Sequence, residues 1–171
     1  MASNLVRLRG KPAPELDGVR GWRGRPVRLA DFKGKYVLLE FWGYWCGPCV
    51  QAMPTLIELH ERFKDKGLVV IGVHCDMSGE TDTPEKLDEK IALLKKNVWQ
   101  GKDLPFPIAL TTKSSTYNEH TFDGTAAAQY GVLGYPTTIL IDKGGKVVGQ
   151  FQARDVKKAI ADVEKLLAPK P

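Results

Sequence analysis

The chain has 171 residues, enough for one domain with a substantial core that needs no disulfide scaffold. Hydrophobic residues make up 43% and charged residues 26%, which excludes a disordered or collagen-like chain, and no stretch approaches the roughly 18 apolar residues of a transmembrane helix. The net charge of +5 comes from residues 1–35, which hold nine basic and three acidic side chains. These charges are scattered along the segment and do not form continuous runs. That scatter indicates a solvated surface, so we expect no nucleic-acid partner.

The first third of the chain predicts small strands followed by a buried one. Between residues 5 and 35, segments punctuated by Gly and Pro predict one or two short strands, with a candidate at 27–29 and a turn at 31–34. The nearly continuous apolar run at residues 37–42 predicts a strand that is covered on both faces.

The middle of the chain alternates helix and strand. A helix is expected from residue 46 to about 66, kinked at Pro54 because proline lacks the N–H that continues the helix. The apolar run at 68–73 predicts a second buried strand. Thr83 and Pro84 then have the residue types of a helix cap and first helical position. The apolar stripe of this helix consists of Leu87, Ile91, Leu94 and Val98.

The last third predicts a β-hairpin and a final helix. A third strand is expected at 106–110, a polar loop at 111–124 and a short helix at 125–130. Strands at 137–142 and 146–151 flank a Lys-Gly-Gly turn. A helix at 155–167 follows, with the inward-facing residues Val156, Ile160, Val163 and Leu167. The alternation predicts an α/β fold with parallel strands first and an antiparallel hairpin at the end.

The segment Trp45-Cys46-Gly47-Pro48-Cys49 follows a predicted strand and opens a predicted helix. If Cys46 begins the helix, Cys49 lies one turn along on the same face, within disulfide range. The N–H groups at a helix start stabilise a thiolate and lower the cysteine pKa. Cys46 is therefore the expected nucleophile and Cys49 the resolving thiol.

Other uses of this cysteine pair are weaker readings of the sequence. A zinc site needs a second Cys/His pair at matched spacing, and only Cys75 and three scattered histidines remain, so we expect no metal. A c-type haem needs His directly after the second cysteine, where Val50 stands. A purely structural disulfide would close too small a loop to stabilise the fold much.

Four segments together resemble the TlpA/ResA-like branch of the thioredoxin-like superfamily. The segment at 41–49 resembles the active-site motif of thioredoxin-like proteins, and the sequences at 10–14, 34–39 and 131–138 resemble further motifs of that branch. The resemblance implies a thioredoxin fold, with a central mixed β-sheet flanked by helices, for residues 1–171 as a single domain. It also implies an N-terminal extension at residues 5–35 and a central helical insertion at 76–104.

The same resemblance implies where a substrate docks. Pro136 is expected in the cis form beside the cysteine pair, in a loop that offers backbone groups to a substrate peptide; an ordinary strand-entry turn is the alternative. Trp45, Gly47, Pro48 and Tyr135 are the expected substrate-binding residues.

Glu40 is a carboxylate in an otherwise apolar run. In thioredoxins an acidic residue at this position lies beneath the resolving cysteine, where burial raises its pKa and lets it exchange a proton with Cys49. The alternative is a glutamate at the rim of the sheet, paired with a lysine.

The sequence also departs from its relatives. Many TlpA/ResA-like proteins carry Glu shortly after the second cysteine, and here Ala52 stands at that position. Cys75 is expected to be a small buried hydrophobe, with a regulatory thiol as the alternative. His60 and His74 are expected to be surface or packing residues.

The resulting hypothesis is a thiol–disulfide oxidoreductase that reduces protein disulfides, with the Cys46–Cys49 pair as its redox-active group and no other cofactor. A peroxiredoxin-like thiol peroxidase and a non-catalytic thioredoxin-like binding module are the alternatives. The expected partners are protein disulfides and a thiol electron donor, and the expected state is a monomer. The N-terminus has no apolar signal region, but the resemblance implies an extracytoplasmic setting, with any anchor outside this chain.

Overall fold

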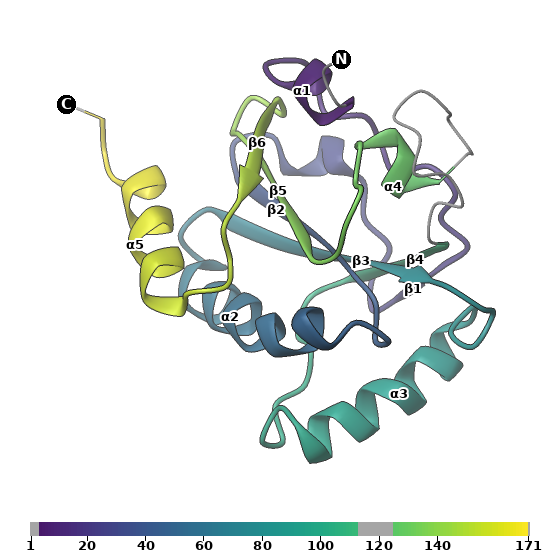
Figure 1. The fold of residues 1–171 in the computed structure, drawn as a ribbon. Coiled ribbons are helices and arrows are strands. Elements are labelled where there is room, and N and C mark those ends of the chain that lie inside the picture. Colours follow the sequence, from purple (N-terminus) through teal and green to yellow (C-terminus); the bar gives the residue numbers. More distant parts are fainter. Residues whose placement is uncertain (1–3, 113–124, 171) are drawn as a thin grey trace.

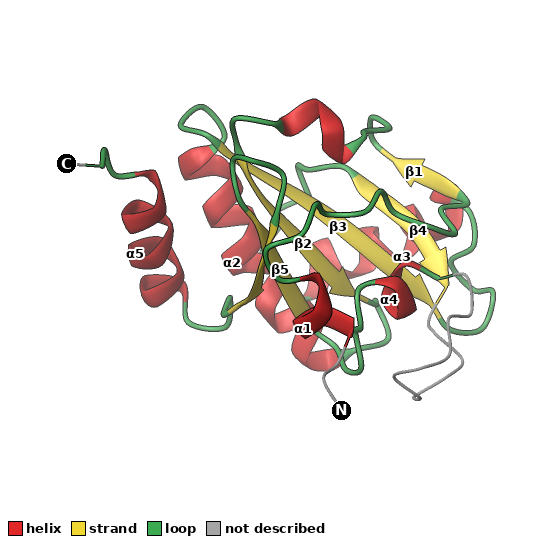
Figure 2. Ribbon diagram, turned by 90° about the horizontal axis from the view of Figure 1, so that it is seen from above, coloured by secondary structure: helices red, strands yellow, loops and turns green. Residues whose placement is uncertain are grey.

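The computed structural model describes residues 4–112 and 125–170, and its centre is a mixed β-sheet (Figures 1 and 2). The strands of the described part lie in the order β1-β4-β3-β2-β5-β6. Their bounds are β1 (Gly21–Arg23), β2 (Tyr36–Trp42), β3 (Leu68–Asp76), β4 (Ile108–Thr112), β5 (Thr137–Ile141) and β6 (Val147–Phe151). The strands β2, β3 and β4 are parallel, whereas β1, β5 and β6 run antiparallel to their neighbours. The expected parallel first half and terminal hairpin are confirmed.

Helices cover both faces of this sheet. The helices are α1 (Asn4–Leu8), the 3-10 helix η1 (Leu29–Phe32), α2 (Gly47–Phe63), α3 (Pro84–Asn97), α4 (Ala126–Gln129) and α5 (Val156–Leu167). Figure 1 shows α2, α3 and α5 on one side of the sheet and α1 and α4 on the other. Each side has its own apolar cluster, and both cysteines of the CxxC motif lie in the cluster under α2.

Three helix starts follow from residues that the sequence shows. The side chains of Thr83 and Asp155 accept hydrogen bonds from backbone N–H groups three residues on, as helix N-caps do. Cys46 is the N-cap of α2, so this helix begins at the CxxC motif as expected. The helix runs on through Pro54.

The strand expected at residues 27–29 is wrong. Residues 27–28 belong to no helix or strand, and η1 begins at Leu29, where the Glu15 carboxylate accepts hydrogen bonds from the backbone N–H groups of Leu29 and Ala30, both at 2.9 Å. The small N-terminal strand is β1, which pairs antiparallel with β4 at the edge of the sheet. Glu15 lies 14 and 15 positions before the two residues that it bonds. A pattern of neighbouring residues therefore does not predict the conformation of this segment.

Some expected boundaries and buried stripes also differ. Strand β3 continues to Asp76 because residues 72–76 pair with β4. Residues 111–112 belong to β4, and 113–124 of the expected loop lie outside the described residues. Val156 is 40% exposed, because α5 lies at the edge of the sheet and buries only a narrow stripe. Val98 is 45% exposed, just after the end of α3.

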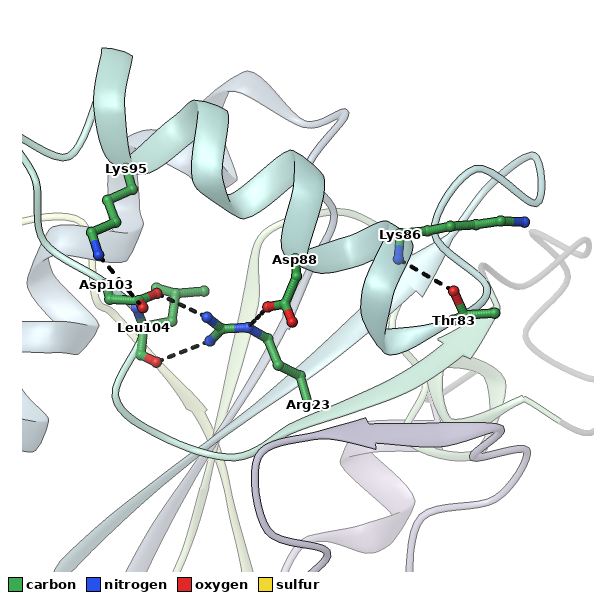
Figure 3. A network of polar contacts seen from close by, with 7 residues as sticks. All are labelled: Arg23, Thr83, Lys86, Asp88, Lys95, Asp103 and Leu104. Carbon is green, nitrogen blue, oxygen red and sulfur yellow. Dashed lines mark hydrogen bonds and ion pairs between the residues drawn. The ribbon is translucent and has the colours of Figure 1, made fainter.

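Arg23 ties the N-terminal extension to the helical insertion (Figure 3). Its guanidinium bonds the carboxylate of Asp88 on α3, the carboxylate of Asp103 at 2.9 Å and the backbone carbonyl of Leu104 at 3.1 Å. The Arg23 side chain is 17% exposed, whereas the carboxylates of Asp88 and Asp103 are 56% and 48% exposed, so these bonds are only partly shielded from water.

Replacing Arg23 by Met should lower the free energy of unfolding by about 1–2 kcal/mol, because one side chain serves three acceptors. The matched control is Arg62→Met, which breaks the Arg62–Glu58 pair within α2, where the arginine is 52% exposed. That control should change stability by less than about 0.5 kcal/mol. Urea unfolding monitored by circular dichroism measures the free energy of unfolding of both variants. Equal losses of stability in the two would contradict the role assigned to Arg23.

Candidate active site

The two cysteines of the motif lie at the start of α2 and are joined as a disulfide. Their Cα atoms are 5.2 Å apart. Cys46 is 7% exposed and Cys49 is fully buried, while Gly47 and Pro48 between them are exposed. The backbone N–H of Cys49 donates to the Cys46 sulfur at 3.3 Å. Cys46 is thus the more exposed residue of the pair, and its sulfur accepts an N–H group of the helix start.

A tight turn carries the chain from β2 into this helix. The N–H of Cys46 donates to the carbonyl of Gly43 at 3.0 Å. The Trp45 indole folds back over Gly43, where an added Cβ would lie 2.3 Å from the ring. Glycine is therefore the residue that lets Trp45 lie against the turn. The indole N–H of Trp45 also donates to the backbone carbonyl of Cys75 at 2.9 Å.

The loop before β5 meets the same turn. The Tyr135–Pro136 peptide bond is cis. The Tyr135 ring packs edge-on against Trp45, with the ring centres 5.3 Å apart. The structure therefore brings Trp45 and Tyr135 together, whereas the exposed Gly47 and Pro48 lie at the first turn of α2.

Glu40 is fully buried in the middle of β2. The sheet register places it between Gly72 on β3 and Thr138 on β5. The Thr138 hydroxyl donates to one carboxylate oxygen of Glu40, and the other oxygen has no hydrogen-bond partner among the described residues. Glu40 is thus a buried carboxyl without a basic partner, and not a glutamate at the rim of the sheet.

The electrostatics of Glu40 follow from this burial. Desolvation raises the pKa of Glu40 from 4.5 to about 7, against the opposing effect of the Thr138 hydrogen bond. On the β3 side Gly72 adds no side chain beside Glu40, and a Cβ there would lie 3.1 Å from the Ile108 side chain, a tight contact. The carboxyl therefore titrates near neutral pH, in the range useful for proton transfer.

A cavity of about 230 Å³ borders Glu40. Its lining includes Ala52, Pro136 and Thr138, together with Gln150 in β6 and Gln152 and Arg154 just after that strand. Ala52 lies one turn after Cys49 in α2. Within the described residues, Glu40 makes no hydrogen bond to either sulfur of the disulfide.

Several residues around the site were not expected from the sequence. Thr138 bonds Glu40 through a strand pairing between residues 98 positions apart. His74 is fully buried and accepts the backbone N–H of Tyr44 at 3.1 Å. A polar residue at the end of a predicted strand was the signal for His74, but its partner depends on how β2 and β3 align.

Cys75 is buried, as expected, and it lies on the opposite face of the sheet from the CxxC pair. Its thiol lies 3.7 Å from the carbonyl oxygen of Val73 and 3.6 Å from the hydroxyl of Thr111. The described residues contain no cluster of three His, Cys, Asp or Glu side chains placed to bind a metal. They also contain no helix that is long and apolar enough to cross a membrane.

Comparisons with known proteins agree with this geometry. The AhpC/TSA family model matches residues 9–150. The thiol-disulfide oxidoreductase ResA of Bacillus thuringiensis subsp. konkukian is 35% identical over 160 residues, which cover 94% of this chain and 79% of ResA.

Solved structures extend the similarity to the fold. The thiol:disulfide interchange protein DsbE from Chlorobium tepidum is 26% identical, with a TM-score of 0.68 over 94% of this chain and 98% of that chain. The thioredoxin domain of a Bacteroides vulgatus thiol-disulfide oxidoreductase is 28% identical, with a TM-score of 0.64 over 98% of this chain and 99% of that domain. With the buried glutamate and the cysteine pair at a helix start, these matches show that the chain belongs to the AhpC/TSA family, as a ResA-like thiol-disulfide oxidoreductase with a thioredoxin fold.

Proposed function

We propose that the chain reduces disulfide bonds in proteins through the dithiol form of Cys46 and Cys49. The observation that carries the proposal is the unequal exposure of the pair, since Cys46 is 7% exposed whereas Cys49 is fully buried. Its place at the start of α2 favours the thiolate, which is the attacking species. The Gly-Pro pair between the cysteines resembles that of reducing thioredoxins and supports this direction of electron flow.

The reaction runs in two exchanges. The Cys46 thiolate attacks one sulfur of the substrate disulfide and forms a mixed disulfide, while the other substrate sulfur leaves as a thiolate and takes up a proton. Cys49 then loses its proton and attacks the Cys46 sulfur. The substrate departs with two thiols, two electrons have moved to it, and Cys46–Cys49 is left as the disulfide that a thiol donor must reduce again.

Glu40 is the proposed acceptor of the Cys49 proton. Its raised pKa means that it can both take and return a proton near neutral pH. It lies on the face of the sheet that α2 covers, since its neighbours Leu38 and Trp42 pack in the same cluster as Cys49. The position of Ala52 on the shared cavity supports a short connection between this carboxyl and the helix.

Trp45, Tyr135 and Pro136, with the exposed Gly47 and Pro48, form the proposed docking surface for the substrate peptide. The edge-on contact of Trp45 with Tyr135 supports a single continuous surface beside Cys46. The proposed setting is extracytoplasmic, as the TlpA/ResA-like resemblance implies. The proposed partners are protein disulfides and a thiol electron donor, and the proposed state is a monomer.

Replacing Cys46 by Ser should abolish reduction of a protein disulfide such as that of insulin, because Cys46 is the proposed attacking thiolate and both Cys49 and Cys75 are fully buried. Replacing Cys49 by Ser should stop the reaction one step later and accumulate the mixed disulfide. Non-reducing electrophoresis and mass spectrometry of the trapped adduct measure both effects.

The alternatives give different results in the same assay. If the chain were a binding module, it would bind its partner without turnover, and the Cys46→Ser variant would bind that partner as well as the wild type does. A thiol peroxidase would consume hydroperoxide faster than it reduces insulin. An adduct on Cys49 in the Cys46→Ser protein would reverse the assigned roles.

Replacing Glu40 by Gln should slow release of substrate from a preformed mixed disulfide at neutral pH by about tenfold or more, because glutamine cannot accept the Cys49 proton. The initial attack by Cys46 should change little. Rapid-mixing kinetics separate the two steps. Thr138→Val is the matched control, because it removes the hydrogen bond to Glu40 but keeps the carboxyl. An unchanged release rate in Glu40→Gln would contradict the proton role.

The Glu40→Gln variant should also be more stable to unfolding than the wild type at alkaline pH. The carboxyl ionises near 4.5 in the unfolded chain and near 7 in the folded protein, so the wild type loses stability as the pH rises through this window. The loss is about 3 kcal/mol above neutral pH and is absent near pH 4. Urea unfolding of the oxidised proteins at both pH values measures it, and parallel pH profiles of wild type and Glu40→Gln would contradict the burial effect.

A further inference from the structure

The turn that presents Cys46 is held from the end of a neighbouring strand. The imidazole Nε2 of His74 on β3 accepts the N–H of Tyr44 at 3.1 Å. One residue on, the carbonyl of Cys75 accepts the indole N–H of Trp45 at 2.9 Å. The two residues between Gly43 and Cys46 are therefore each tied to β3 by one hydrogen bond.

The His74 ring is itself held in one orientation. Trp42, its register partner on β2, packs against it edge-on at 4.9 Å between ring centres. The Tyr44 ring stacks on it at 6.1 Å, with 14° between the planes. The ammonium of Lys90 on α3 lies over the Tyr44 ring, 5.1 Å from its centre. The aromatic neighbours thus aim Nε2 at the Tyr44 N–H.

The second ring nitrogen indicates that His74 does more than fill space. Its Nδ1 is buried and has no hydrogen-bond partner among the described residues. A buried polar atom without a partner costs free energy, and an aliphatic side chain would avoid that cost. The feature of histidine that the structure uses is the acceptor at Nε2. Burial lowers the pKa of His74 to about 4, which keeps this acceptor unprotonated at neutral pH.

The hydrogen bond between His74 and Tyr44 is linked to the Cys46 sulfur by a short stretch of backbone. The Gly43 carbonyl accepts the Cys46 N–H at 3.0 Å, which closes the turn with Tyr44 at its first corner. Cys46 has the extended backbone of an N-cap, with its side chain turned toward the first N–H groups of α2. A rotation of the Tyr44 peptide would move the sulfur relative to those groups.

We propose that His74 is a positioning residue for the disulfide exchange: by accepting the Tyr44 N–H it holds the turn that sets Cys46 against the start of α2. The inference rests on the proposed function and adds a residue from a neighbouring strand to it. Without this acceptor, the Cys46 thiolate is less well stabilised and reacts more slowly at a given pH.

Three variants test the acceptor and separate it from general stability. In His74→Gln the side-chain oxygen can reach the place of Nε2, whereas the shorter amide of His74→Asn cannot. His74→Leu keeps the volume and removes both nitrogens. His60→Leu is the control, since His60 is a half-buried histidine near the far end of α2 that packs against Phe106.

The measurement is the pH profile of Cys46 alkylation in the reduced proteins, followed by mass spectrometry of the Cys46 peptide. Urea unfolding of each variant is measured in parallel. At slightly acid pH, His74→Asn and His74→Leu should alkylate about fivefold more slowly or worse, while His74→Gln and His60→Leu stay within about twofold of wild type. If His74→Leu does not fold, the comparison of Gln with Asn alone decides.

Equal rates for His74→Gln and His74→Asn would overturn the inference, as would a wild-type rate in folded His74→Leu. This outcome is distinct from failure of the proposed function. If the wild type did not reduce protein disulfides, the proposed function would fail, while the alkylation series would still report whether His74 sets the reactivity of Cys46.

Discussion

The pairing of β2 with both β3 and β5 is the constraint on which the site depends. Glu40 lies fully buried in the middle of β2, and among the described residues its carboxylate accepts a hydrogen bond from Thr138 on the neighbouring strand β5. The same pairing places the ends of two neighbours beside the point where β2 stops. His74 then reaches the turn before Cys46 from one side, and the loop carrying Pro136 reaches it from the other.

The two faces of the sheet carry different functional groups. The face under α2 carries the CxxC pair, Glu40 and His74, whereas the opposite face carries Cys75 and the apolar side chains of the N-terminal extension. Because strand residues alternate between faces, Cys75 is separated from the reactive pair although its neighbour His74 adjoins the turn before it. The extension covers the second face and leaves the start of α2 accessible.

Local chemistry could be predicted from the sequence, whereas contacts between distant residues could not. The caps at Thr83 and Asp155 and the start of α2 at Cys46 depend on neighbours within one turn, so a single sequence is sufficient. The bond between Thr138 and Glu40 depends on a strand register that no local pattern specifies. The expected strand at 27–29 failed for the same reason, since the carboxylate of Glu15 decides the conformation of that segment.

The cavity beside Glu40 separates two routes through the enzyme. In the proposed exchange, electrons enter and leave at Cys46, which follows Trp45 in the turn that Tyr135 packs against. The cavity beside Glu40 is lined instead by Gln150 in β6 and by Gln152 and Arg154 just after that strand. If Glu40 takes the proton of Cys49, it can discharge that proton to solvent while the substrate still covers the sulfur. The acid is then ready for another cycle independently of how long the product remains bound.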